Sequence, residues 1–295
     1  MNIKNVKAFV AVVRHKGFTQ AAAALFLTQS AVSKAVKSLE DELDVTLLNR
    51  KTAEISLTFA GEIVYKRATT VLLELESLAA EINEFKGMIR GVLRIGLPPV
   101  ASGALFAAMF TAYRSQYPEI EIELIEHGGS ILKDLLRKGE IEIAAVLRSD
   151  DQEFDFMEIR REPLRVILNK EDPLANADNI DFNMLKGHPF ILFEKGFTLN
   201  SVIIDACERR GFHPKISARS AQVDFIIDLV TARLGVAFLP NVIAQQHAHK
   251  NIVVKTLHEA QTDWNIGLAW RKETALSPAA RAWLELAKGY QQLEG

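Results

Sequence analysis

The chain has a single cysteine, Cys207, among its 295 residues. One thiol cannot form an internal disulfide or supply a cysteine-rich zinc site. No apolar run approaches the roughly 20 residues that span a bilayer. No basic segment followed by an apolar stretch resembles a signal peptide. We therefore expect a soluble cytoplasmic protein with no membrane partner.

A strong overall charge is also missing, because 35 Lys and Arg oppose 37 Asp and Glu to leave a net charge of −2. The charge is unevenly distributed, however. Residues 1–60 contain 8 basic and 5 acidic side chains, a net of +3, so the rest of the chain carries −5. Positive charge concentrated near one end suits a polyanionic partner there, although it narrows the choice of partner only slightly.

The chain lacks the short motifs of several enzyme classes: GxSxG, GxxxxGK[ST], HExxH and the glycine-rich dinucleotide fingerprint. Cys207 lies in a helical pattern, where a buried, inert thiol is commoner than a nucleophile or redox sensor. Disulfide switching would need a second cysteine. His247, His249 and His258 could hold a metal, but no carboxylates or thiols support them. We expect no catalytic residue, no metal and no cofactor.

The segment LTQSAVSKAVKSLEDEL, residues 27–43, carries two unlike stripes at helical spacing. Thr28 stands where an N-cap belongs, so the helix is predicted to begin at Gln29. The apolar stripe suits a core, whereas the polar stripe needs either a partner or plain solvation. The apolar stripe comprises Val32, Val36, Leu39 and Leu43, and the polar stripe comprises Ser30, Ser33, Lys34 and Lys37.

Two shorter helical patterns precede this segment. Asn2 can cap a helix that Gly17 ends, and Thr19 can cap an alanine-rich helix that closes at Leu25. The alanine-rich helix and the helix that begins at Gln29 are joined by a tight turn, and the second of them has a polar outer face. This arrangement is that of a helix-turn-helix. Serines and lysines on such a second helix can donate to phosphates and base edges in the major groove.

Residues 44–58, DVTLLNRKTAEISLT, predict a small hairpin around a four-residue turn, with Arg50 and Lys51 at its tip. A basic hairpin beside a recognition helix is a wing, which can reach phosphates or the adjacent minor groove. From the residues alone, the alternative is an ordinary small helical domain with solvated lysines.

Residues 18–61 resemble the winged helix-turn-helix of LysR-type transcriptional regulators. The matching pieces, in order and spacing, are Phe18-Thr19, Ala21-Ala22, TQSAVS at 28–33, LEDEL at 39–43, Leu47-x-x-Arg50 and LTFAG at 57–61. The resemblance implies that residues of the second helix and of the wing lie at the DNA surface. The predicted DNA-binding residues are Thr28, Gln29, Ser30, Ser33, Lys34, Lys37, Arg50 and Lys51.

Three positions depart from the pattern of this family. Asp44 and Arg233 stand where the family usually has Gly, and Leu48 replaces an aromatic residue. Asp44 closes a helix, where a left-handed conformation is tolerated best by Gly, then by Asn and Asp. We expect the fold to survive at some cost in stability, and the turn at Arg233 to be altered.

Residues 58–86 contain no Pro, and the only Gly is Gly61. Apolar residues, Ala68 among them, recur with spacings of 4, 3, 4, 3, 4 and 3, which predicts an a/d heptad seam. A helix of about 45 Å is too long to bury this seam in a small domain. A second copy of the chain is the expected partner; packing against the C-terminal domain is the alternative. The resemblance implies a dimer of such linker helices, commonly assembled into tetramers. The predicted dimerisation residues are Val64, Val71, Leu75, Leu78, Ile82 and Phe85.

Beyond Gly91, strand and helix patterns alternate. VLRIGL, IEIELIEH and IEIAAVL are typical of strands, and SGALFAAMFTAYRSQ and SILKDLLRKG, between them, of helices. This βαβαβ run with short connections predicts a parallel sheet. A second α/β unit follows, with LRVILN as its first strand, and Ser277 and Pro278 are predicted to begin the last helix.

Ligands of open α/β sheets bind at the carboxyl ends of strands, near helix N-termini. Three such ends are LPPVASG at 97–103, EHGGS at 126–130 and FEKGFTLNS at 193–201, and Arg148 adds a positive charge. These features suit a small polar or anionic effector. Equally, the hydroxyls could be ordinary helix caps, and Arg148 could form a surface ion pair.

The family resemblance extends over this region through LRIG, KGEIEIAA, GFHP and LVTARLGVAFLP. It implies a two-lobed α/β effector domain, similar to periplasmic binding proteins, with the effector held between the lobes. It does not identify the effector. The predicted effector-binding residues are Val100, Ala101, Ser102, Gly129, Ser130, Arg148, Phe197 and Thr198.

The sequence thus predicts a ligand-responsive LysR-type regulator whose partners are double-stranded DNA, further copies of itself and RNA polymerase. The alternatives are a DNA-binding protein without an effector and a ligand-binding protein with an unrecognised enzymatic activity. We expect a winged helix-turn-helix at 1–58, a linker helix at 59–88 and an effector domain at 92–295. Within the effector domain, lobe I is expected at about 92–162 and 266–295, and lobe II at about 163–265.

Overall fold

The computed structural model describes residues 1–49, 55–85, 90–248, 251–272 and 274–293. These residues form two compact units, which are described separately. One unit comprises Met1–Ile82 and Lys138–Glu140, and the other comprises Asn83–Arg137 and Ile141–Gly295.

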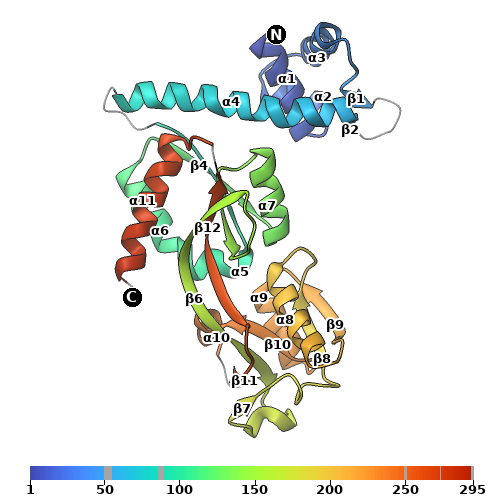
Figure 1. Cartoon of the computed structure of the whole chain (residues 1–295), viewed down its shortest axis with the longest axis vertical. Helices are drawn as coiled ribbons and strands as arrows, with labels where there is room; N and C mark the ends of the chain where they lie inside the picture. Colours follow the sequence, from blue (N-terminus) through green and yellow to red (C-terminus); the bar gives the residue numbers. More distant parts are fainter. Residues whose placement is uncertain (50–54, 86–89, 249–250, 273, 294–295) are drawn as a thin grey trace. The chain divides into compact units, whose positions relative to one another are not determined.

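The N-terminal unit is a small helical domain with a hairpin. Its core joins residues of all four helices, among them Phe9, Ala22, Val36 and Tyr65. The rings of Phe9 and Tyr65 meet edge to face with centroids 6.4 Å apart. Its elements are α1 (Ile3–Arg14), α2 (Phe18–Ala24), α3 (Gln29–Leu43), β1 (Leu48–Asn49), β2 (Ser56–Leu57) and α4 (Phe59–Phe85) (Figure 1).

The junction between α1 and α2 differs from the prediction. The Asn2 side chain caps α1 as expected, but α1 ends at Arg14 and Lys16 adopts the left-handed conformation, with φ of 53°. The Gly17 amide bonds to Val12 O and the Lys16 amide to Val13 O, which is the Schellman arrangement. Gly17 is therefore the extended residue before α2, and α2 begins one residue before the predicted cap at residue 19.

The hairpin and the start of α4 are held by polar contacts. Glu40 Oε1 accepts from the Leu47 and Leu48 amides at 2.8 and 3.3 Å. Thr58 Oγ1 accepts from the Gly61 amide at 2.9 Å and so caps α4. A Cβ at Gly61 would lie 2.1 Å from Leu47 O, so the backbones can approach this closely only with glycine there.

Lobe I of the second unit is a sheet with helices on both faces (Figure 1). β4 and β5 both pair in parallel with β3, as the βαβαβ pattern predicts. Along β5, Ile143 and Ala145 belong to the main core, whereas Ala144 and Val146 pack with residues of α7. The elements are β3 (Gly91–Leu97), α5 (Pro99–Ala101), a π-helical turn (Ser102–Phe106), α6 (Ala107–Gln116), β4 (Ile120–Glu126), α7 (Gly129–Lys138), β5 (Ile143–Leu147) and α11 (Pro278–Leu293).

One predicted helix is in fact composite, and another begins as predicted. The pattern SGALFAAMFTAYRSQ gave a single helix, but its first five residues form the π-helical turn, so only residues from Ala107 belong to α6. At the other end of the chain, Ser277 Oγ accepts from the Ala280 amide at 3.1 Å, and α11 begins at Pro278.

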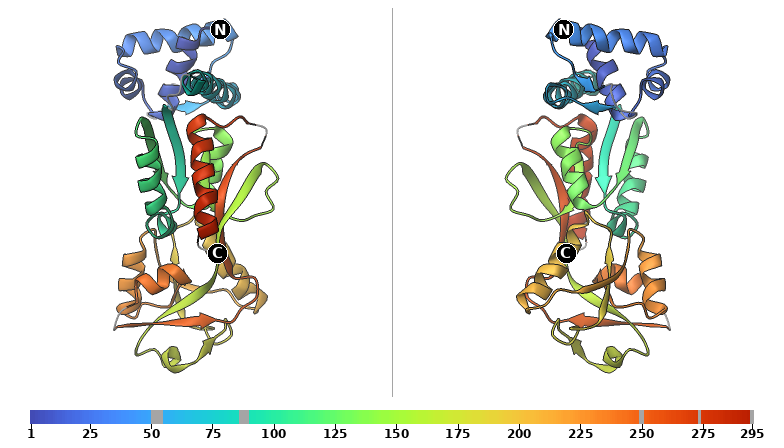
Figure 2. Two further views of the ribbon diagram at one scale, coloured as in Figure 1. Left: turned by 90° about the vertical axis from the view of Figure 1, so that its left-hand side faces the viewer. Right: turned by 90° about the vertical axis from the view of Figure 1, so that its right-hand side faces the viewer.

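Two long antiparallel strands connect lobe I to lobe II (Figure 2). β6 (Phe154–Asn169) begins ten residues before the predicted LRVILN strand, and β12 (Asp263–Arg271) pairs with it over its whole length. Eight of the described strands form one sheet, in the order β4-β3-β5-β12-β6-β11-β7, where β11 is Ile252–Leu257 and β7 is Asn179–Ile180. The eighth strand, β10 (Ala237–Pro240), also pairs with β6. The two long strands β6 and β12 therefore belong to both lobes.

Lobe II packs helices against this shared sheet and a separate parallel pair, β8 and β9. Arg233 has φ of 64°, so the turn that usually contains Gly keeps its left-handed backbone with an arginine in place. The elements are a 3-10 turn (Pro173–Asn176), β7 (Asn179–Ile180), β8 (Pro189–Phe193), α8 (Thr198–Arg209), β9 (Lys215–Ser220), α9 (Val223–Thr231), β10 (Ala237–Pro240), α10 (Asn241–Gln246) and β11 (Ile252–Leu257).

Candidate nucleic-acid interface and effector cleft

A hydroxyl side chain caps the N-terminus of α3. Thr28 Oγ1 accepts from the Ala31 amide at 3.2 Å, so the helix begins at Gln29 as predicted. The same hydroxyl lies 3.1 Å from Ser30 Oγ. This cap presents polar side chains together at the first turn of the helix.

The predicted DNA-binding residues of α3 share one surface, opposite the buried stripe. Ser33 is half-buried and the others are exposed. Among the described residues, no acidic side chain forms an ion pair with Lys34 or Lys37. Hydroxyl, amide and ammonium donors are thus available to an external anion. The set comprises Thr28, Gln29, Ser30, Ser33, Lys34 and Lys37.

The hairpin that follows α3 is present. The side-chain Nδ2 of Asn49 donates to Leu57 O at 3.0 Å and to Ser56 Oγ at 3.2 Å, which ties the two strands together. Leu48, in the position of the family's aromatic residue, is buried in the core. Arg50 and Lys51, predicted at the tip, lie outside the described residues.

The predicted seam of α4 divides into two parts. Val64 and Ala68 pack against the core of the N-terminal unit. The later members are exposed, with exposed fractions between 36% and 57%. These side chains are available to a partner helix, while the Phe85 side chain lies outside the described part. The exposed members are Val71, Leu75, Leu78 and Ile82.

Four of the predicted effector residues line one small pocket of about 20 Å³ between the lobes. The four are Val100 and Gly129 from lobe I and Phe197 and Thr198 from lobe II. Trp264 lines it from β12 and is 1% exposed. The remaining lining residues are Pro98, Ala145, Val146, Leu147, Leu199 and Ile266.

Ser130 closes this region rather than lining it. Its amide and its hydroxyl both donate to Gly196 O, at 3.1 and 3.0 Å, and so join the two lobes directly. A Cβ at Gly128 would lie 2.5 Å from the same oxygen. The lobes therefore touch backbone to backbone at this point.

Like Ser130, the three remaining predicted effector residues do not line this pocket. Ala101 is fully buried in the core. Ser102 Oγ donates to Glu126 Oε1 at 2.8 Å. Arg148 is exposed, and its guanidinium lies 4.0 Å from the carboxylate of Glu158 on β6, the surface ion pair that the sequence left open.

A wider cleft of about 700 Å³ shares Val100 with this small pocket. Lobe I contributes Val100, Gly103 and Glu126 to it. Lobe II contributes the segment that leads into α9 and residues of α10 and its C-terminal end. Sequence reasoning missed the lobe II residues because no motif marks them and they come from segments far apart in the chain. They are Ala221, Gln222, Val223, Asp224, Ile243, Gln246 and His247.

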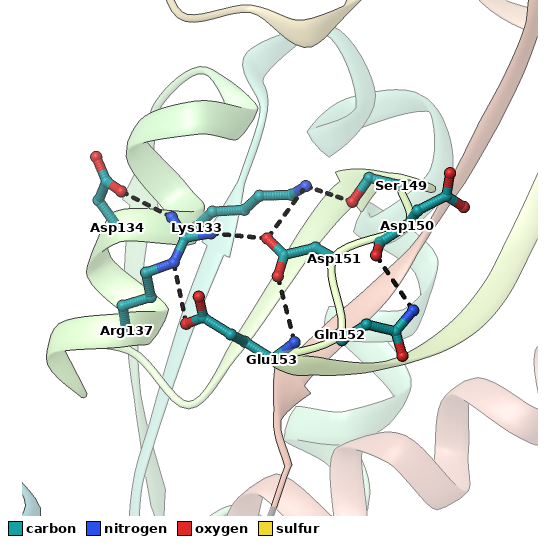
Figure 3. A network of polar contacts seen from close by, with 8 residues as sticks. All are labelled: Lys133, Asp134, Arg137, Ser149, Asp150, Asp151, Gln152 and Glu153. Atoms are coloured by element: carbon teal, nitrogen blue, oxygen red, sulfur yellow. Dashed lines mark hydrogen bonds and ion pairs between the residues drawn. The ribbon is translucent and has the colours of Figure 1, made fainter.

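A polar network fixes the far end of α7 (Figure 3). Arg137 contacts Asp151 at 2.7 Å and Glu153 at 3.2 Å, and Lys133 Nζ lies 2.5 Å from Ser149 Oγ. Burial lowers the pKa of the Lys133 ammonium group, although the nearby Asp151 carboxylate opposes this shift. The helix whose first residue lines the cavity is thus anchored to the loop before β6.

Two family models match the chain, one over the N-terminal unit and one over the two lobes. Residues 3–62 match the family described as bacterial regulatory helix-turn-helix protein, lysR family. Residues 86–292, well over half of the chain, match the LysR substrate binding domain. The chain is a LysR-type transcriptional regulator. The DNA-binding and effector-binding domains of this family are both present.

Individual relatives and solved structures are similar to this regulator over nearly its whole length. The "uncharacterized HTH-type transcriptional regulator YwbI" of Bacillus subtilis is 33% identical over 98% of this chain and 97% of its own. A full-length OxyR variant from Pseudomonas aeruginosa has a TM-score of 0.78 at 23% identity, covering 99% of this chain and 95% of that one. Full-length CbnR complexed with its target DNA has a TM-score of 0.66 at 18% identity, covering 98% and 100%. The two structures show the shared fold.

Cys207 of this LysR-type regulator is a buried free thiol on α8. Burial raises its pKa to about 12, so the reactive thiolate is scarce at neutral pH. Among the described residues, which leave out His249, no group of three or more His, Cys, Asp or Glu could hold a metal ion. None of the described helices has both the length and the apolar character that crossing a membrane requires.

Proposed function

We propose that this LysR-type regulator reads DNA with the exposed face of α3 and the adjoining wing. The observation that carries this proposal is the division of α3 into two faces. Val32, Val36 and Leu39 of the apolar stripe are fully buried, whereas the hydroxyls, the amide and the two lysines of the other face are exposed or, at Ser33, half-buried. Donors of this kind suit phosphates and base edges of the major groove. The wing residues Arg50 and Lys51 belong to the same proposed surface.

The exposed seam of α4 supports a dimer, and two dimers would form the tetramer. An a/d seam left exposed on a single helix gains stability when a second helix covers it. Two copies then present two α3 helices, which can read the two halves of an inverted repeat about one helical turn or more apart. The domain limits that we propose are 1–58, 59–88 and 92–295, with the lobe boundaries given above.

We propose that an effector bound between the lobes changes how the copies place their DNA-binding domains. The change would alter the footprint or bend of the DNA, and hence the access of RNA polymerase. A ligand shifts such an equilibrium only through different affinities for the two states. The chain would act by binding rather than catalysis. Because its target is chromosomal DNA, it would work in the cytoplasm.

A DNA-binding protein without an effector is the second candidate, and one observation favours it. The pocket at the predicted effector residues is small, at about 20 Å³. The neighbouring 700 Å³ cleft and the match to a substrate binding domain favour effector control. Loss of all small-molecule response, with specific DNA binding intact, would establish the second candidate.

The proposal is tested by selecting genomic fragments with the purified full-length protein and footprinting those that are enriched. Enrichment of an interrupted inverted repeat upstream of a neighbouring gene supports specific regulation. Binding that is indifferent to sequence and collapses as salt rises would contradict it. The variant Ser33→Ala with Lys34→Ala should lose specific binding while keeping its oligomeric state, and unchanged affinity would overturn the groove assignment.

A further inference from the structure

The turn between α2 and α3 carries the most exposed large apolar side chain of the described residues. Phe26 is 96% exposed, and the next residue, Leu27, is 52% exposed. Ala23 and Ala24, at the end of α2, are exposed as well. The turn therefore presents a small apolar surface to its surroundings.

The backbone of this turn favours a smaller residue than phenylalanine. The Phe26 amide donates to Ala23 O at 3.2 Å and the Leu27 amide to Ala22 O at 2.9 Å, which is the Schellman arrangement. Phe26 occupies its left-handed position, with φ of 56°. Glycine or asparagine is the usual residue at such a position. Because the Phe26 ring is almost fully exposed and adds strain to the backbone, its role lies outside the fold.

The turn leads directly into the polar face of α3. The N-cap Thr28 follows Leu27, and its hydroxyl oxygen lies 3.1 Å from that of Ser30. Gln29 and Ser30 are both exposed on the first turn of the helix. The N-terminal residues of a recognition helix are the ones that contact base edges. Phe26 thus stands at the border of the surface that is proposed to read DNA.

The chemistry of the turn suits a base rather than a phosphate. No residue between Lys16 and Lys34 is charged, so neither α2 nor the turn can neutralise a phosphate. In the major groove, the C5-methyl group of thymine is the apolar feature of the base edges, and phenylalanine is one of the side chains that contact it.

We propose that Phe26 is a specificity-determining residue, whose ring packs against a thymine methyl group at the edge of the sequence that α3 reads. This assignment rests on the proposed function, because α3 must lie in the major groove. Leu27 extends the same apolar surface. The hydroxyls and lysines of α3 cannot recognise a methyl group, since it accepts no hydrogen bond. Phe26 therefore adds a kind of base recognition that the polar face of α3 lacks.

Removing single methyl groups from the operator tests this contact. Once selection and footprinting have identified the operator, each thymine of one half-site is replaced in turn by uracil, which keeps every hydrogen-bonding group and lacks the methyl group. At one position the replacement should weaken binding of the full-length protein about fourfold, as expected for one buried methyl group. Phe26→Asn should bind the thymine operator about tenfold more weakly and should not respond to that uracil.

Lys16→Asn is the matched control, because Lys16 occupies the corresponding left-handed position at the end of α1, with φ of 53°. Both asparagine variants should raise the midpoint of thermal unfolding by about 2–8 °C, since asparagine tolerates this backbone better. Lys16→Asn should keep the wild-type response to uracil. A purely structural Phe26 would not give higher stability together with loss of methyl recognition.

Two results overturn the base contact: no single uracil weakens binding of the wild type, or Phe26→Asn responds to uracil as the wild type does. If Phe26→Asn keeps its operator affinity but lowers the transcript yield from an operator–promoter template, the turn contacts RNA polymerase and the DNA assignment is wrong. Specific operator binding without any methyl effect leaves the proposed function standing. If no sequence is enriched at all, the proposed function fails and the base contact fails with it.

Discussion

α3 and α4 carry similar apolar stripes, yet the structure buries one and leaves most of the other exposed. On α3, Val32, Val36 and Leu39 are fully buried against α1 and α2. On α4, Val64 and Ala68 pack against the core, whereas the seam residues from Val71 to Ile82 are at least 36% exposed. An apolar stripe therefore indicates that a helix packs against a partner. Only the length of the helix indicates whether that partner lies in the same domain.

The largest effect is expected from placing charges in the exposed apolar stripe of α4. Leu75→Glu with Leu78→Glu should dissociate the dimer, because four carboxylates would face one another across the seam. Loss of the second half-site should lower operator affinity by about a hundredfold to ten-thousandfold. Sedimentation velocity and footprinting measure the two effects. The off-seam control Glu74→Gln should behave as wild type; an unchanged sedimentation profile for the double variant would remove the coiled-coil proposal.

The second effect concerns the buried stripe of α3. Leu39→Ala should lower the free energy of unfolding of the N-terminal unit by about 2–5 kcal/mol, because it leaves a cavity in a fully buried position. Urea denaturation of the full-length protein measures the change. The neighbouring exposed variant Lys37→Ala should stay within about 0.5 kcal/mol of wild type. Equal effects of the two variants would contradict the division of α3 into faces.

The third prediction tests whether the polar face of α3 contacts DNA phosphates. Lys34→Ala should leave stability unchanged but weaken operator binding about tenfold, and the slope of log affinity against log salt should fall by about 0.9. Titrations at several salt concentrations measure both quantities. Lys66→Ala on α4 is the matched removal of a charge away from this face. An unaltered salt slope in the Lys34 variant would mean that Lys34 contacts no phosphate.

The smallest effects lie at the helix ends, where Lys16 and Asp44 both have left-handed backbones, with φ of 53° and 51°. Lys16→Gly should stabilise the fold by about 1 kcal/mol, because glycine adopts this conformation without steric cost. Asp44→Gly should gain less, about 0.5 kcal/mol, because Asp tolerates the conformation better. Thermal unfolding followed by circular dichroism measures both. A loss of stability in either variant would show that the lysine or aspartate side chain compensates for the strain.

Sequence reasoning succeeded where one element carries its own signal. The Thr28 cap, the left-handed Asp44, the two stripes of α3 and the heptad spacing of α4 are all local patterns, and the structure contains each of them. It was less successful where either of two neighbouring residues could adopt the left-handed conformation that ends a helix. Gly17 predicted a helix stop, but the hydrogen bonds of the Schellman arrangement placed the left-handed residue at Lys16 instead.

The site between the lobes was only partly predictable, for a different reason. Strand ends pointed to Val100, Gly129 and Thr198, which do line the same cavity. Gln222 and His247 of the wide cleft carry no motif, and only the packing of α9 and α10 brings them to it. The early start of β6 was missed as well, because residues 155–160 are all half-buried and no alternation of buried and exposed side chains marks this part of the strand.

The long strands β6 and β12 also constrain how this protein can change over evolutionary time. Because successive strand residues face opposite sides of a sheet, one inserted residue between the lobes would invert every later side chain of that strand. Val166 and Leu168 would then exchange faces with Ile167, all of which are buried. Insertions and deletions should therefore accumulate in the loops of each lobe, while the length of these two strands stays fixed among descendants of this chain.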